Sequence, residues 1–182
     1  MSRIFIIIFY LATSFTLYTA CSSGQERGID TNNDDFILQC DTLLGAYPDI
    51  VVKKLDSAIA VSRFNEERYS LLLLKSKAKL FMSEYDSVQI LLDSISDYYA
   101  RYRDEKKMYK ILSNVNNIRG NLYARRTVMD SAVIYFDKAY KNSSRLGLSH
   151  DLIDISINLA DSYVRCGKFD LGAYWYRKSL LI

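Results

Sequence analysis

The sequence predicts an all-α fold built from antiparallel helix hairpins, and three observations lead to that prediction. From Asp35 onward, apolar residues recur at the 3.6-residue spacing of a helix. The 182 residues include one proline and seven glycines, far fewer turn formers than a β-sandwich or barrel needs. Apolar residues make up 49% and charged residues 25%, which is ordinary for a folded chain and excludes wholesale disorder.

Turn and cap residues divide this stretch into eight expected helices. The connections between them are short, so neighbouring helices should run antiparallel. Pro48 fits the first position of a helix, Gly147 fits a C-terminal cap, and Ser149 fits the N-cap of the next helix. The expected helices cover residues 34–46, 48–61, 65–82, 85–100, 103–125, 129–144, 149–165 and 169–182.

The first twenty residues indicate an export signal. Arg3 gives a basic start, residues 4–17 are uncharged and mostly apolar, and small residues precede Cys21. The five residues that end at Cys21, LYTAC, resemble a bacterial lipobox. That resemblance implies that residues 1–20 are removed and that Cys21 is acylated. An uncleaved transmembrane anchor and ordinary secretion are the alternatives.

A polar segment separates this signal from the helical part of the chain. Residues 21–34 contain two glycines and no apolar period, which predicts a flexible tether ahead of a helical domain at 35–182. The other cysteines, Cys40 and Cys166, could form a disulfide in an exported chain. They lie 126 residues apart in the sequence, and we expect two separate, half-buried thiols.

The second half of the chain contains an internal repeat. A shift of 40 residues places small residues on small residues and aromatic residues on aromatic residues. The pattern resembles the tetratricopeptide repeat (TPR), a helix pair in which a small residue lets two helix axes approach and an aromatic side chain fills the hole beside them. The packing positions are Gly120, Tyr123, Ala132, Phe136 and Ala139 in one unit, and Ala160, Tyr163, Gly172 and Tyr176 in the next.

The resemblance, which extends to exported bacterial TPR lipoproteins, implies a TPR-like α-solenoid of about three and a half to four repeats over 35–182. In this family the first helix of each pair lines a concave groove that holds a protein or peptide. Asn offers both a donor and an acceptor there, and Arg suits a carboxylate. A solvated face without a ligand is the alternative. The groove candidates, carried over by position, are Asn117, Asn121, Arg125, Asn158, Asp161 and Arg165.

Motifs for catalysis, cofactors and metals are missing from the sequence. It contains no GxxxxGK, GxGxxG, HExxH or CxxC pattern, and His150 is its one histidine. One histidine and three cysteines are too few for a usual zinc site. We therefore expect no enzymatic activity, no catalytic residues, no metal and no cofactor.

The charge balance gives no case for nucleic acid as a partner. The net charge of +3 comes from 24 basic and 21 acidic residues. The basic and aromatic run at 98–110 is interrupted by acidic residues, and we interpret it as a helix junction with snorkelling side chains. Contact with anionic lipid headgroups is the alternative for this run.

The last expected helix ends on three aliphatic residues, Leu180, Leu181 and Ile182, with no polar capping helix after it. We expect either a truncated piece of a longer array or self-association through this helix. The sequence thus predicts a non-enzymatic protein- or peptide-binding scaffold, lipid-anchored in the cell envelope of a bacterium. The alternative is the N-terminal sensing fragment of a longer TPR-containing membrane signalling or transcriptional regulator.

Overall fold

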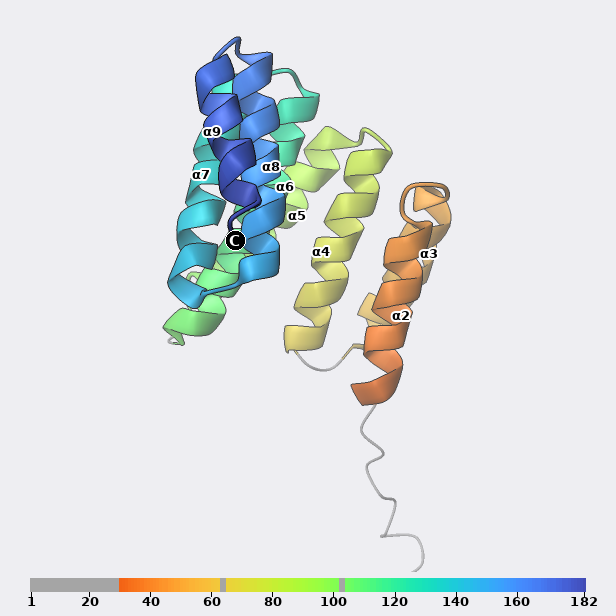
Figure 1. The fold of residues 1–182 in the computed structure, drawn as a ribbon. Coiled ribbons are helices and arrows are strands. Elements are labelled where there is room, and N and C mark those ends of the chain that lie inside the picture. Colours follow the sequence, from red (N-terminus) through yellow and green to blue (C-terminus); the bar gives the residue numbers. More distant parts are fainter. Residues whose placement is uncertain (1–29, 63–64, 102–103) are drawn as a thin grey trace, which may run out of the picture. The chain divides into compact units, whose positions relative to one another are not determined.

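The computed structural model describes residues 30–62, 65–101 and 104–182, and within them it contains eight helices and no strand. The expected all-α class is confirmed. The export signal, Cys21 and residues 22–29 of the tether lie outside the described residues. Among the helices described, none is both long and apolar enough to cross a membrane. The helices are α2 (Asp30–Leu43), α3 (Pro48–Val61), α4 (Asn65–Phe81), α5 (Tyr85–Tyr99), α6 (Glu105–Arg125), α7 (Met129–Leu146), α8 (Ser149–Arg165) and α9 (Phe169–Ser179), all shown in Figure 1.

Each helix from α3 onward packs against its neighbours along the chain. The contacts run from α3 to α4, then in order to α9, and Asp35–Ile182 forms one compact unit. Two further contacts skip a helix, because α4 also meets α6 and α6 also meets α8. The result is a helical repeat-like fold in which α4, α6 and α8 share a surface.

The apolar core consists of three clusters in chain order. The first joins α2, α3 and α4 around Leu55, and the second joins α4, α5 and α6 around Leu92. The third joins α7 and α8 around Phe136, with half-buried residues of α6 and α9 packed against it. Each fully buried side chain of this size contributes about 1.5–3 kcal/mol to folding. Helix α4 belongs to two clusters, so packing links one hairpin to the next.

Several helix boundaries differ from those expected. Helix α2 begins at Asp30 and ends at Leu43. Its early start was not expected, because its first turn consists of polar residues and shows no apolar periodicity. Asp104 accepts hydrogen bonds from the backbone of Lys106 and Lys107, so α6 begins only after it, at Glu105. Helix α7 runs on to Leu146, beyond the expected end at 144, and α9 ends at 179 rather than 182.

The caps of the α7–α8 turn agree with the sequence in part. Gly147 ends α7 with φ +65°, a left-handed conformation that glycine adopts without steric cost. The expected N-cap is wrong by one residue, since Leu148 caps α8 and makes no side-chain bond. Ser149 is already helical there. Pro48 does occupy the start of α3, where its missing N–H leaves no bond unmade.

The two described cysteines are both free thiols. The expected separate thiols are therefore confirmed, but the expected half-burial holds only for Cys166. Cys40 is 1% exposed, because it stands on the apolar side of α2 within the first core cluster. Burial raises the pKa of the Cys40 thiol above its usual value, although the positive charge of Lys54 acts against that rise.

Candidate functional site

The described part of the chain holds no group of three or more His, Cys, Asp or Glu residues that could bind a metal ion. His150 lies at the start of α8 with 91% of its side chain exposed. Its one ion-pair partner is the exposed Asp154, with 3.8 Å between Nδ1 and Oδ2. Surface groups in this arrangement have neither the burial nor the hydrogen-bond partners of a usual acid–base pair. The candidate site is the surface that carries the groove candidates of the sequence.

That surface is the side on which α4, α6 and α8 meet, and we name it the first-helix face. All six groove candidates of the sequence analysis lie on α6 or α8. Side chains three or four positions apart are neighbours on one helix surface, which places the candidates of each helix in one row. The face consists of Phe81 on α4, of Asn117, Asn121 and Arg125 on α6, and of Asn158, Asp161 and Arg165 on α8.

Two contacts join α4 to α6 at or beside this face. The amide Nδ2 of Asn114 donates a hydrogen bond to the hydroxyl of Tyr69 at 3.2 Å. The guanidinium of Arg125 lies over the ring of Phe81, 5.0 Å from its centroid. Stacking holds the guanidinium plane while leaving its N–H groups free to donate at the edge. Arg125 is thus an exposed cation with a supported orientation.

The α6–α8 side of the face is joined by a pair of asparagines. Nδ2 of Asn158 donates to Oδ1 of Asn117 at 3.1 Å, and both residues are half-buried. The bond leaves Asn117 with its amide N–H₂ and Asn158 with its carbonyl oxygen. Asn121 stands one helical turn beyond Asn117 and is also half-buried. The structure thus brings two of the groove candidates into direct contact.

Asp161 and Arg165 extend the face along α8. The Tyr176 hydroxyl, on α9, donates a short hydrogen bond to Oδ1 of Asp161. That bond, together with burial and the negative charge of Asp161, raises the pKa of Tyr176 above its usual value. Arg165 is exposed. One oxygen of Asp161 is therefore already bonded to Tyr176, whereas the cationic side chain of Arg165 is exposed to solvent.

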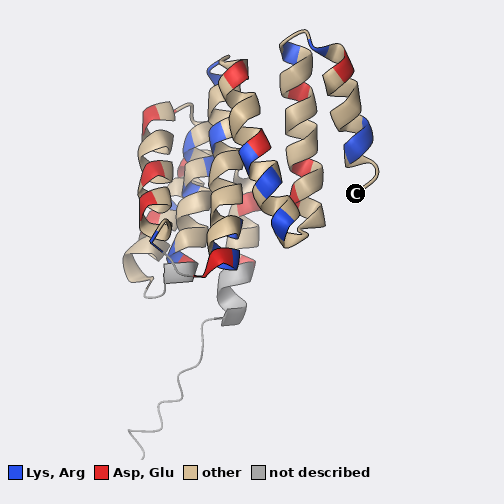
Figure 2. Cartoon of the chain, turned by 90° about the vertical axis from the view of Figure 1, so that its left-hand side faces the viewer, with Lys and Arg blue, Asp and Glu red and all other residues tan. Residues whose placement is uncertain are grey.

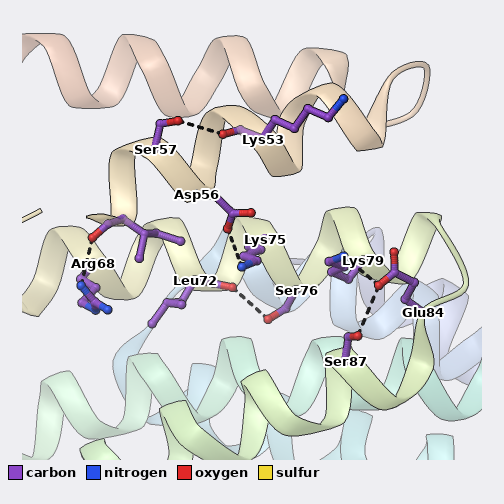
Figure 3. Close-up of polar contacts among 11 residues, drawn as sticks. Lys53, Asp56, Ser57, Arg68, Leu72, Lys75, Ser76, Lys79, Glu84 and Ser87 are labelled. Carbon is purple, nitrogen blue, oxygen red and sulfur yellow. Dashed lines mark hydrogen bonds and ion pairs between the residues drawn. The ribbon is translucent and has the colours of Figure 1, made fainter. Parts of the chain in front are cut away.

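Two basic residues of α4 form ion pairs, unlike the arginines of the first-helix face. Lys75 pairs with Asp56 at 2.5 Å, and Lys79 pairs with Glu84 at 2.7 Å (Figure 3). The bond from Lys79 lowers the pKa of the Glu84 carboxyl. By contrast, neither Arg125 nor Arg165 forms an ion pair with any side chain that the structure describes. Charges of both signs are otherwise spread over the helices in the view of Figure 2.

Most of the repeat-packing positions lie between the helices, but Tyr176 is exposed and bonds to Asp161 of the first-helix face, so its expected packing role is not seen. A Cβ placed on Gly120 would lie 2.5 Å from ring carbons of Phe136, and Phe136 itself is 1% exposed. A Cβ on Gly172 would lie 2.5 Å from Cγ2 of Val164. The alanines at 132, 139 and 160 are fully buried, whereas Tyr123 and Tyr163 are half-buried and Tyr176 is exposed. The glycines thus mark the closest approaches of α6 to α7 and of α8 to α9.

Sequence reasoning missed Phe81, Tyr69 and Asn114 as parts of this region. A signal for Phe81 was present, since Ser76 occupies the small position of α4 as Gly120 does in α6. The same five-residue step that leads from Gly120 to Arg125 leads from Ser76 to Phe81. Tyr69 and Asn114 meet across 45 residues of sequence, and no local pattern indicates that contact.

Comparison with known proteins gives no relative for this chain: no family model, no curated protein and no solved structure matches it.

Proposed function

We propose that this chain is a non-enzymatic scaffold that binds a protein or an extended peptide on its first-helix face, within a TPR-like α-solenoid. The observation that carries the proposal is the pair of exposed guanidinium groups of Arg125 and Arg165, which form no ion pair among the described side chains and stand at matching positions 40 residues apart. Both lie on the helices that carry the half-buried amides of Asn117, Asn121 and Asn158.

The solenoid arrangement is supported by which helices touch. In a stack of hairpins, the first helix of each pair meets the first helix of the next, as α4 meets α6 and α6 meets α8. The tight contacts at Gly120 and Gly172 agree with the same packing scheme, because each lets the two helices of one hairpin approach closely.

The chemistry of the face favours a ligand with a carbonyl-rich backbone and at least one carboxylate. Asn121 presents an amide that can both donate to and accept from an extended peptide backbone. Arg125 and Arg165 can each form a two-point bond with a carboxylate. Asp161 adds one acidic group, which disfavours ligands that place negative charge beside it.

The proposed address is the bacterial cell envelope, with the chain anchored through an acylated Cys21. The support is the basic start, the apolar run and the lipobox-like LYTAC of the sequence. A transmembrane anchor is the competing proposal. Replacing Cys21 by Ser separates them, since it should release the chain from membranes and abolish fatty-acid labelling in the first case and do neither in the second.

The binding proposal is tested by affinity capture from solubilised membranes, with an Asn121→Ala/Arg125→Ala variant beside the unaltered chain. The variant should lose the captured partner, because two of its polar anchors are gone. A matched control, Lys53→Ala/Lys141→Ala, removes two exposed side chains from α3 and α7 and should keep it. Capture of every partner by the face variant, or an equal loss in the control, would contradict the proposal.

A further inference from the structure

Three aromatic rings surround one ammonium group where α7 meets α9. Nζ of Lys178 lies 4.5 Å from the ring centroid of Tyr140, 4.6 Å from that of Trp175 and 5.7 Å from that of Tyr174. The Tyr140 and Trp175 rings are 4.9 Å apart and inclined at 74°. The Tyr174 and Trp175 rings are 5.5 Å apart and inclined at 81°. Three rings at steep angles, facing one cation, have the geometry of an aromatic cage.

The cage holds its cation in the charged state. Burial acts to lower the pKa of Lys178, but the hydrogen bonds that its ammonium group donates to the Tyr140 and Tyr174 hydroxyl oxygens, with the electrostatic attraction of these groups, outweigh burial and raise that pKa. The rings therefore face a full positive charge at neutral pH. Each ring face attracts that charge through its quadrupole.

We propose that Tyr140, Tyr174 and Trp175 form a binding site for a quaternary ammonium group, which Lys178 fills when no ligand is bound. The rings already accept a cation of the right charge at the right distance. A quaternary ammonium carries its charge on methyl groups that water hydrates weakly, so it gains more from an aromatic cage than the strongly hydrated ammonium of a lysine.

The side chain that fills the cage lies at the end of a helix and is partly exposed to solvent. Lys178 sits on a flexible four-carbon stem in the last turn of α9, and its side chain is half-buried. Tyr174 is 54% exposed, so one wall of the cage faces solvent. Because Lys178 competes for the rings, the apparent affinity for an added cation is reduced by the fraction of time that the lysine occupies them. This inference is independent of the first-helix face, since it uses only α7 and α9.

The test uses the fluorescence of Trp175, the one tryptophan in the sequence. The purified chain is titrated with tetramethylammonium chloride and with choline chloride, against ammonium chloride at equal ionic strength. Lys178→Ala, which empties the cage, should bind both quaternary ions about tenfold more tightly than the unaltered chain. The matched control Lys141→Ala, at an exposed lysine on α7, should leave the affinity unchanged.

Two further arms keep the result interpretable. Tyr174→Ala on the Lys178→Ala background removes an exposed wall and should abolish the gain, with circular dichroism confirming that the helices persist. Vesicles of phosphatidylcholine, compared with vesicles of phosphatidylglycerol, show whether the ammonium group can come from a lipid headgroup or only from a free ion. Equal affinities of Lys178→Ala and the unaltered chain, or binding that survives Tyr174→Ala, would overturn the proposal.

Discussion

At the scale of single residues, the fold depends on where small side chains stand. Gly120 and Phe136 fit one another so closely that an added methyl group would overlap the ring. Ser113 shows the same closeness in polar form, since its hydroxyl lies 3.0 Å from the carbonyl of Ala139 and 2.5 Å from the hydroxyl of Ser143. Both contacts join α6 to α7, and both require a small residue on α6, because a larger side chain would not fit there.

Gly120→Ala should therefore lower the free energy of unfolding by about 1–3 kcal/mol, because the Phe136 ring must move within a filled core. Alanine's better helix propensity, worth about 1 kcal/mol, offsets part of the loss. Urea denaturation followed by circular dichroism measures the change. Gly45→Ala, where no atom lies within 4 Å of the new methyl group, is the control and should be near neutral. Equal effects at the two positions would refute this packing argument.

Because of Tyr69, the free energy of unfolding should depend on pH in the alkaline range. Burial is the main cause that raises the pKa of Tyr69 far above the usual range of a tyrosine, while the bond from Asn114 acts in the opposite direction. A phenol whose pKa is higher in the folded than in the unfolded chain contributes stability below the unfolded pKa and loses it as pH rises above that value. The raised pKa of the Cys40 thiol acts in the same direction.

We predict that the free energy of unfolding is level through neutral pH and falls above about pH 9–10. Tyr69→Phe should lose about 1 kcal/mol at neutral pH, the worth of its hydrogen bond, and should show a shallower alkaline decline. Tyr47→Phe, at an exposed tyrosine, should keep the original profile. Urea titrations from pH 7 to pH 11 measure both effects, and an unchanged alkaline slope in Tyr69→Phe would count against the assignment.

At the scale of helices, periodicity in the sequence was enough to predict eight helices and their order. It could not locate ends made of polar residues, as at Asp30, where the helix begins without an apolar residue to mark it. Periodicity also could not predict the bond between Asn117 and Asn158. The two residues are 41 positions apart, and their contact depends on how α6 and α8 pack. Their nomination as site residues rested on the family resemblance alone.

Helix α5 offers the clearest test of packing between hairpins. Leu92 is fully buried in the cluster shared by α4, α5 and α6, whereas Ile90, on the same helix, is 69% exposed. Leu92→Ala should destabilise the chain by about 2–5 kcal/mol through lost burial and the cavity left behind. Ile90→Ala should change stability by less than about 0.5 kcal/mol. Urea midpoints that fall equally in the two variants would contradict the core assignment.

At the scale of the whole molecule, α9 presents an apolar surface to solvent. Phe169 and Tyr176 on α9, and Leu180 just beyond its last residue, are exposed and stand seven and four residues apart, so they line one side of this segment. The residues 40 positions earlier, such as Phe136 on α7, are covered by α8. Exposed apolar stripes of this kind favour association.

We propose that the purified chain self-associates through α9, which sedimentation velocity over a range of concentrations would reveal as a rising average mass. Leu180→Asp should shift the chain toward monomer by placing a charge in the stripe. Ile134→Asp, at an exposed apolar residue of α7, should leave association unchanged. A monomer at every concentration, or an equal shift in both variants, would count against association through α9.

If the face shared by α4, α6 and α8 is the binding surface, site-specific photo-crosslinking should join a partner to it. A benzophenone amino acid placed at position 121 reports on that face, and the same group at position 53, on α3, reports on a second-helix surface. In cells that export the chain, light should join a partner to position 121 and not to position 53. Adducts from position 53 alone, or in equal yield from both, would contradict the claim.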